Sequence, residues 1–309
     1  MIIDIHMHLG NILERGGGAL IGQTAAYPHV ELLRLDDLFR YEQNPMTTLV
    51  SKHMGERVKR EEQRRNAAAT LANAQAMLEE AAAWDKQRGG DGCVSAYVQP
   101  IAPHVTFWDL LAALTHEPRL HPFGSPDFSL SIDETITDLE RQAQAGAWGL
   151  KIHPIIQCVQ LDSPAVRAAL ACWQQAAPGK PVLFHTGCSS YYPTHQRHRE
   201  RPEYSDPLAA ARLIADFPQV PVILGHAGLF ELQTWADCAR FDHVYVDGSF
   251  QGPRQWKELW RIYGEHRLLH ASDWPYGRAV TALRSVSAGL KGEDLERVLW
   301  RNAAGLLCI

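Results

Sequence analysis

The chain has 309 residues, of which 46% are hydrophobic and 21% charged, so it has the composition of an ordinary globular protein and enough residues for one large domain. Thirty basic and thirty-five acidic side chains give a net charge of −5, which argues against nucleic acid or an anionic membrane as a partner. The six cysteines form no CxxC pair, no apolar run is long enough to span a membrane, and the N-terminus has no signal-peptide pattern, so we expect a cytoplasmic protein.

Eight short runs rich in apolar and β-branched residues recur along the chain, and each ends in polar residues. Most of them are nearly continuous apolar segments, which is typical of strands buried on both faces of a parallel sheet. The runs span 2–6, 93–98, 120–124, 148–153, 181–186, 221–226, 243–249 and 268–273. Because helical patterns lie between them, we predict an α/β fold in which the sheet closes, a single (β/α)8 TIM barrel over residues 1–309.

The predicted first and second strands are separated by more than 80 residues, far beyond a usual crossover. Residues 54–88 of this excursion are rich in Ala, Glu, Arg and Lys and contain no Pro, which favours helix. The second half is predicted to be the first barrel helix because one apolar stripe runs along it, made of Leu71, Ala74, Leu78, Ala81 and Trp84. Residues 55–66 are polar all round, so we expect them to project into solvent or toward a partner subunit of a homo-oligomer.

Local signals also predict where two other helices begin and end. Ser163-Pro164 and Asp206-Pro207 each have the pattern of an N-cap residue followed by proline at the first helical position. Gly146 and the Pro178-Gly179 pair stand where helices are expected to end.

Histidines are frequent, with fifteen in the chain, and several stand at the ends of predicted strands. His6 and His8 end the first strand, His185 the fifth, His226 the sixth, and Asp273 the eighth. The C-terminal ends of the strands meet at one end of such a barrel, and residues two apart on a strand share a face. Imidazoles together with a carboxylate suit zinc or a similar divalent ion. The sequence therefore predicts a metal site at this end of the barrel.

The strand-end motifs resemble those of the amidohydrolase superfamily, in the branch of predicted metal-dependent hydrolases that also includes aminocarboxymuconate-semialdehyde decarboxylase-like enzymes. The matching segments follow one another in the family's order over nearly the whole chain, with 11–92 unmatched. They are DIHMHLG (4–10), GLKIHPIIQ (149–157), PVLFHTG (181–187), VPVILGHAG (220–228), VYVDGS (244–249), ASDWPYG (271–277) and RNAAGLL (301–307). The resemblance indicates a family and a barrel fold, and it does not indicate a substrate.

The resemblance implies that His6, His8, His185 and Asp273 are the metal ligands, and this set of imidazoles and a carboxylate favours Zn²⁺ as the ion. A bound divalent ion lowers the pKa of its water to about 7, and Asp273 would then be the catalytic base that accepts the proton. His226 would be a second catalytic residue that polarises the substrate carbonyl or stabilises an oxyanion. The alternative for His226 is that it is a fifth ligand.

Lys151 and His153, at the end of the predicted fourth strand, have two interpretations each. Some members of the superfamily carry a carbamylated lysine here that bridges two metals, whereas a charged Lys151 would pair with Asp4 or bind a substrate carboxylate. His153 either lines the pocket or is bonded to backbone. Trp274 and Tyr276 likewise either form a wall of the pocket or pack the last loop.

The leading hypothesis is a metal-dependent hydrolase that acts on an ester, lactone or amide bond of a small, polar, carboxylated molecule. The alternative is a metal-dependent, non-oxidative decarboxylase on the same scaffold. Hydrolysis is favoured because the motifs GLKIHP and PVLFHTG resemble a branch usually predicted to be hydrolytic, and because the sequence gives no evidence of an aromatic-rich pocket for a ring substrate. A barrel that only binds a ligand is a third hypothesis, against which the complete set of metal ligands argues.

Overall fold

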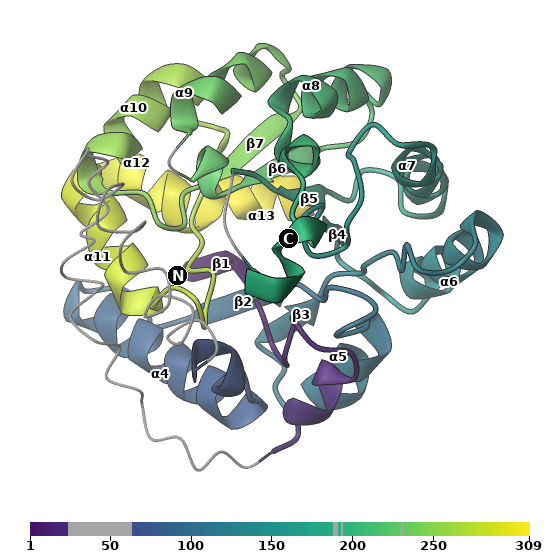
Figure 1. Cartoon of the computed structure of the whole chain (residues 1–309). Coiled ribbons are helices and arrows are strands. Elements are labelled where there is room, and N and C mark those ends of the chain that lie inside the picture. Colours follow the sequence, from purple (N-terminus) through teal and green to yellow (C-terminus); the bar gives the residue numbers. More distant parts are fainter. Residues whose placement is uncertain (24–63, 188–190, 193, 230) are drawn as a thin grey trace.

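The computed structural model describes residues 1–23, 64–187, 191–192, 194–229 and 231–309. In this described part of the chain, eight parallel strands lie inside a surrounding layer of helices (Figure 1). In chain order they are β1 Ile2–Met7, β2 Val94–Val98, β3 Leu120–Pro122, β4 Leu150–Ile152, β5 Val182–His185, β6 Val222–Gly225, β7 Val244–Asp247 and β8 Leu268–Leu269. Each strand coincides with one of the eight predicted apolar runs.

The strands pair in two groups, β1-β2-β3 and β4-β5-β6-β7-β8, and backbone hydrogen bonds join the groups at both seams. Between β3 and β4, the Lys151 amide donates to the Gly124 carbonyl at 2.8 Å. Between the segment after β8 and β1, the Asp273 amide donates to the His6 carbonyl at 2.8 Å, and the His8 amide donates to the Trp274 carbonyl at 2.7 Å. The ring of strands is therefore closed, and the predicted TIM barrel is confirmed.

Helices cover the outer face of this ring. The main ones are α4 Leu71–Gln87, α5 Phe107–Leu114, α6 Ile132–Gln144, α7 Pro164–Ala176, α8 Pro207–Asp216, α10 Pro253–Tyr263 and α11 Ala279–Gly289, with shorter helices α9 Leu232–Trp235, α12 Gly292–Glu296 and α13 Asn302–Leu307. Two predicted helix starts are confirmed, because Ser163 accepts a hydrogen bond from the Val166 amide and Asp206 accepts one from the Leu208 amide. The last long helix, α11, packs beside the first, α4, so the helical layer also closes.

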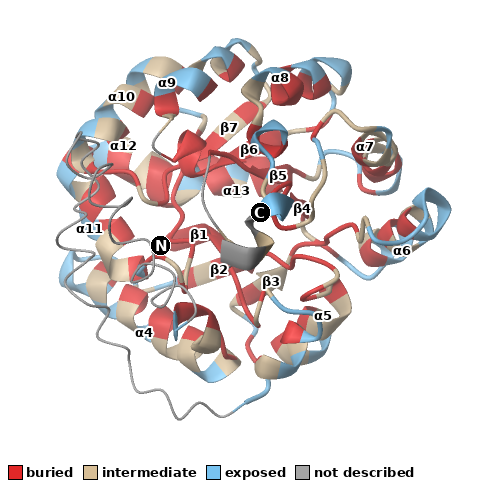
Figure 2. Ribbon diagram, in the orientation of Figure 1, coloured by how far each residue is buried: buried red, intermediate tan, exposed pale blue. Residues whose placement is uncertain are grey.

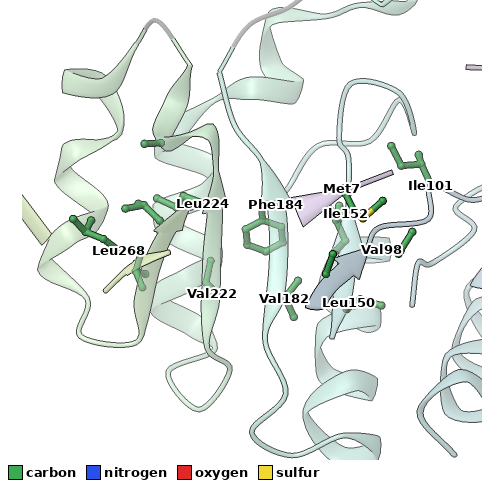
Figure 3. Close-up of a cluster of buried hydrophobic side chains, with 14 of the residues drawn as sticks. Met7, Val98, Ile101, Leu150, Ile152, Val182, Phe184, Val222, Leu224 and Leu268 are labelled. Carbon is green, nitrogen blue, oxygen red and sulfur yellow. The ribbon is translucent and has the colours of Figure 1, made fainter. Parts of the chain in front are cut away.

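Successive strand residues alternate between the helical layer and the barrel interior. On β5, Val182 and Phe184 belong to the core between strands and helices, which Figure 3 shows in close-up. Leu183 belongs to a second core inside the ring, and His185 follows it two residues later on the same face. The strands and the inner sides of the helices are accordingly buried (Figure 2).

The interior core closes one end of the barrel and leaves the other end to polar side chains. Its strand residues are joined by residues of α13, which crosses the ring of strands in Figure 1. The members are Ile3, Ile5, Tyr97, Phe123, Leu183, Ile223, Leu269, Ala271, Ala303, Leu306 and Leu307. Two residues beyond Tyr97, Leu183 and Ala271 stand Gln99, His185 and Asp273, all buried. The polar end therefore rests on a packed apolar layer.

The excursion between β1 and β2 is described only in part. Its last helix, α4, is the predicted first barrel helix, and Ala74, Leu78 and Ala81 of the predicted stripe are buried. The polar stretch 55–66 lies largely outside the described residues. Among the helices that are described, none is both long enough and apolar enough to cross a membrane.

Candidate active site

Three predicted ligands converge at the C-terminal end of the strands. His6 Nε2 and His8 Nε2 lie 3.4 Å and 3.3 Å from the same atom, Asp273 Oδ1. All three side chains are buried. Because burial lowers the pKa of His6 well below its ordinary value, this imidazole is neutral and can bind a metal through a free lone pair.

The Nδ1 atoms of His6 and His8 each lie next to a hydrogen-bond acceptor. His6 Nδ1 lies 2.8 Å from Asp247 Oδ2, and His8 Nδ1 lies 2.7 Å from the Gln99 carbonyl oxygen. Both partners are acceptors, so each Nδ1 carries the proton and each Nε2 presents its lone pair toward Asp273. This is the arrangement that a metal-binding imidazole requires.

Two groups of three residues in the described part of the chain could hold an ion, His6/His8/Asp273 and His6/His226/Asp247. In the second group, Asp247 already accepts four hydrogen bonds, from the amides of His226 and Ser249, the Ser249 hydroxyl and His6 Nδ1. In the first group, Asp273 Oδ1 is buried and has no hydrogen-bond partner among the described residues, a costly arrangement that a cation would relieve. The first group therefore fits a divalent ion better.

His226 and His185 lie beside this group. Their rings are 4.8 Å apart, with His226 Nε2 3.1 Å from His185 Nδ1, and the His226 ring is 4.9 Å from that of His6. The Tyr191 hydroxyl lies 3.0 Å from His185 Nε2. The structure thus brings all the predicted ligands and His226 into one cluster, while the ligand role of His185 stays a prediction.

Lys151 is fully buried within the cluster, with Nζ 2.8 Å from His6 Nε2. Burial lowers the pKa of Lys151 to about 7, against the opposing effect of Asp273 and Asp247. The expected partner Asp4 instead accepts hydrogen bonds from the amides of His6 and Ser272. A lysine with a lowered pKa is partly neutral near pH 7, so Lys151 can serve as an amine as well as a cation.

His153 is bonded to backbone, which is one of its two interpretations. Its Nδ1 accepts a hydrogen bond from the Ile156 amide at 3.2 Å, as expected for a histidine bonded to backbone. Its ring also stacks on that of His185, with centroids 4.0 Å apart and planes 13° apart. His153 therefore supports the cluster from the side of β4.

Aromatic rings from three loops pack against the imidazoles, a feature that the strand-end motifs do not indicate. Tyr191, after β5, packs edge-on against His153 and His185 at 4.8 Å and 5.5 Å. Phe250, after β7, lies 5.4 Å from His226, and Tyr276, after β8, lies 5.9 Å from His8. We call Tyr191, Phe250 and Tyr276 the aromatic collar. The predicted wall residue Tyr276 belongs to it, and its hydroxyl donates to Asn66 Oδ1.

Three residues of the site that are not glycine have a positive φ angle, in the left-handed region of backbone conformation. The φ angles are 61° for His226, 62° for Phe250 and 53° for Asp273. This region costs roughly 1–2 kcal/mol per residue, and such strain is found most often at functional sites. Here it turns the chain just after β6, β7 and β8.

Strand-end position indicates His6, His8, His185, His226, Asp273 and Lys151 from sequence, because their place follows from the barrel. The same argument indicates Asp247 and Ser249, although it gives them no role. Gln99, Tyr191 and Phe250 are harder to find, since a backbone carbonyl and two loop rings leave no pattern in the sequence.

The chain belongs to the amidohydrolase family, whose model matches residues 3–308. This family match spans the closed barrel and every residue of the cluster. No curated protein matches the sequence.

Several solved structures share the fold over nearly the whole chain. An uncharacterised TIM-barrel protein from Bordetella bronchiseptica has a TM-score of 0.68 at 16% identity, with 99% of this chain and 98% of that chain covered. The 5-carboxyvanillate decarboxylase LigW from Sphingomonas paucimobilis has a TM-score of 0.62 at 14% identity, covering 100% and 99%. A dihydroxybenzoic acid decarboxylase from Polaromonas sp. JS666, with bound manganese and the inhibitor 2-nitroresorcinol, has a TM-score of 0.61 at 14% identity, covering 99% and 96%.

Proposed function

We propose that this protein is a metal-dependent, non-oxidative decarboxylase of a small carboxylated ring compound. The observation that carries the proposal is the aromatic collar, because three rings around a buried imidazole cluster suit a flat, unsaturated substrate better than a flexible one. The decarboxylases with the same fold act, by their names, on carboxylated aromatic rings. Their likeness supports the same substrate class for this chain.

His6, His8 and Asp273 would hold the ion, with His185 as the further ligand that the sequence predicts. When bound, a divalent ion supplies a Lewis acid for the oxygens of a carboxylated substrate. Zn²⁺ and Mn²⁺ are both candidates, because two imidazoles and a carboxylate suit zinc, whereas the Polaromonas structure holds manganese.

The side chains around this group provide for the remaining chemistry. Lys151 Nζ, which lies 2.8 Å from His6 Nε2, would bind a substrate carboxylate. Decarboxylation breaks the bond from the ring carbon to the carboxylate and forms a carbon–hydrogen bond, so it needs a proton donor beside the ring. Asp273 is the available carboxyl group, since Asp247 already accepts four hydrogen bonds from the chain.

Hydrolysis is the competing proposal, and the same Asp273 favours it. Its Oδ1 lies at the metal group without a hydrogen-bond partner among the described residues, as a base that accepts a proton from water would. The two reactions differ in where the atoms of water end up.

The test is an isotope experiment on the metal-loaded protein. We expect 2,6-dihydroxybenzoate or 5-carboxyvanillate to release carbon dioxide in D₂O, with one deuterium on the ring carbon that lost the carboxylate. In H₂¹⁸O the aromatic product should carry no label. Turnover of esters, lactones or amides with ¹⁸O in the product, and no release of carbon dioxide from ring acids, would establish hydrolysis instead.

A further inference from the structure

Asp247 and Ser249, at the end of β7, connect two histidines that come from different strands. Asp247 Oδ2 lies 2.8 Å from His6 Nδ1, and Ser249 Oγ lies 2.7 Å from His226 Nδ1. The Ser249 hydroxyl donates to Asp247 Oδ1 at 2.5 Å, so the two contacts share one carboxylate. Both side chains have 0% exposure, and water therefore does not compete for these hydrogen bonds.

The hydrogen-bond donors and acceptors fix the proton on each ring. Asp247 accepts four hydrogen bonds, and one of them comes from His6 Nδ1. His6 must therefore carry its proton on Nδ1, so its Nε2 has no proton. The Ser249 hydroxyl already donates to Asp247, so its oxygen can only accept from His226. His226 therefore also carries its proton on Nδ1, and its bare Nε2 faces the cluster.

We propose that Asp247 and Ser249 are positioning residues that set the tautomers of His6 and His226 through separate contacts. Asp247 turns His6 Nε2 toward the metal group, and Ser249 turns His226 Nε2 toward His185 Nδ1 beside that group. A neutral His226 is then a hydrogen-bond acceptor, whereas polarising a carbonyl would require a donor at Nε2. The inference rests on the proposed metal dependence, and it holds equally for decarboxylation and hydrolysis.

Asp247→Asn nearly keeps the shape of the side chain but changes which nitrogen of His6 can carry the proton. The amide oxygen is expected to remain at the Oδ1 position, where three donors meet. The amide NH₂ then faces His6 Nδ1, and two donors cannot face each other. His6 must move its proton to Nε2, the atom needed by the ion, so affinity for Zn²⁺ should fall by about 10–100-fold, as is usual for partners of metal-binding imidazoles.

Ser249→Ala removes the acceptor for His226 and leaves the contact between Asp247 and His6 in place. Affinity for Zn²⁺ should therefore stay within about twofold of the wild type, whereas turnover should fall by about 10–100-fold. Ser287→Ala is the matched control, because the Ser287 hydroxyl donates only to the Leu283 carbonyl of its own helix, α11. Both quantities should be unchanged in that control.

The experiment measures Zn²⁺ affinity by chelator competition and turnover of 2,6-dihydroxybenzoate for these three variants. It also measures ¹⁵N histidine spectra of the chelator-treated wild type, with signals assigned by their loss in His6→Gln and His226→Asn. We expect protonated Nδ1 and bare Nε2 on both rings. Wild-type Zn²⁺ affinity in Asp247→Asn, equal loss of Zn²⁺ in Ser249→Ala, or an Nε2-protonated ring would overturn the proposal.

These measurements stay informative if an Asp247 variant does not fold, because the spectra use the wild-type chain. They are also independent of the proposed reaction. If no ring acid is turned over, the decarboxylase proposal fails, while Zn²⁺ affinity and the ring spectra still decide the roles of Asp247 and Ser249.

Discussion

His8 and His226 both present a bare Nε2 to the site, but their surroundings predict different roles. His8 Nε2 lies 3.3 Å from Asp273 Oδ1, within the metal group, whereas His226 Nε2 lies 3.1 Å from His185. His8→Ala should therefore lower the bound metal well below the roughly one ion per chain expected for the wild type. His226→Asn should retain the ion and lower turnover by about a hundredfold. Elemental analysis together with steady-state kinetics checks both, and loss of the ion from His226→Asn would make His226 a ligand.

Much of the histidine cluster could be predicted from sequence, because its residues stand at the ends of predicted strands. His6, His8, His185 and Asp273 were identified because the ends of parallel strands meet, which needs no knowledge of loop geometry. The aromatic collar was not, because Tyr191 and Phe250 reach the site only through the turns that follow β5 and β7. The proposal of decarboxylation depends on these rings, which the strand pattern does not indicate.

At the element scale, β7 and α10 meet at Gly248, which lies between the two positioning residues. A Cβ atom at this position would stand 2.0 Å from Cη2 and 2.1 Å from Cζ2 of Trp256, a ring that is 1% exposed. Gly248→Ala must therefore displace the strand end or the tryptophan, and we expect a loss of about 1–3 kcal/mol in the free energy of unfolding, together with weaker Zn²⁺ binding. Urea unfolding measures the first quantity and chelator competition the second.

A second substitution separates this clash from a general intolerance of alanine. The atoms nearest to the added methyl group belong to the six-membered ring of Trp256, so the double variant Gly248→Ala/Trp256→Leu should lose less than the sum of the two single losses. Gly305→Ala in α13 is the control, because nothing lies within 4 Å of its added Cβ. Additive losses in the double variant would contradict the clash.

The elements themselves were largely predictable, and the reason is the two-sided burial of the strands. All eight apolar runs became strands because a parallel barrel buries both faces, so composition alone marks them. Their lengths were less predictable. The run 120–124 pairs as a strand only over Leu120–Pro122, and Gly124 forms an isolated bridge to Leu150 across the seam. Amino-acid composition does not indicate which backbone groups form the hydrogen bonds that join β3 to β4.

At the scale of the whole molecule, the closed barrel holds several histidines away from water, and acid should therefore destabilise it. His270 is the simplest case, because it follows β8 outside the metal group and its Nδ1 has no hydrogen-bond partner among the described residues. Burial lowers the pKa of His270 from 6.5 to about 4, against the opposing effect of Asp247. Below pH 6.5 the unfolded chain binds a proton at this residue that the folded barrel does not bind.

The contribution of His270 to stability is thus fully present above pH 6.5 and is lost as the pH falls toward 4. Between pH 7.5 and pH 5 it amounts to about 2 kcal/mol. We expect the chelator-treated wild type to lose about that much more stability over this interval than His270→Leu, in which no proton can bind. Urea unfolding of both proteins at the two pH values measures the difference, and the other buried histidines cancel because both proteins contain them. Equal losses would mean that His270 is protonated inside the folded barrel, where only a partner for its buried Nδ1 or access of water could stabilise the charge.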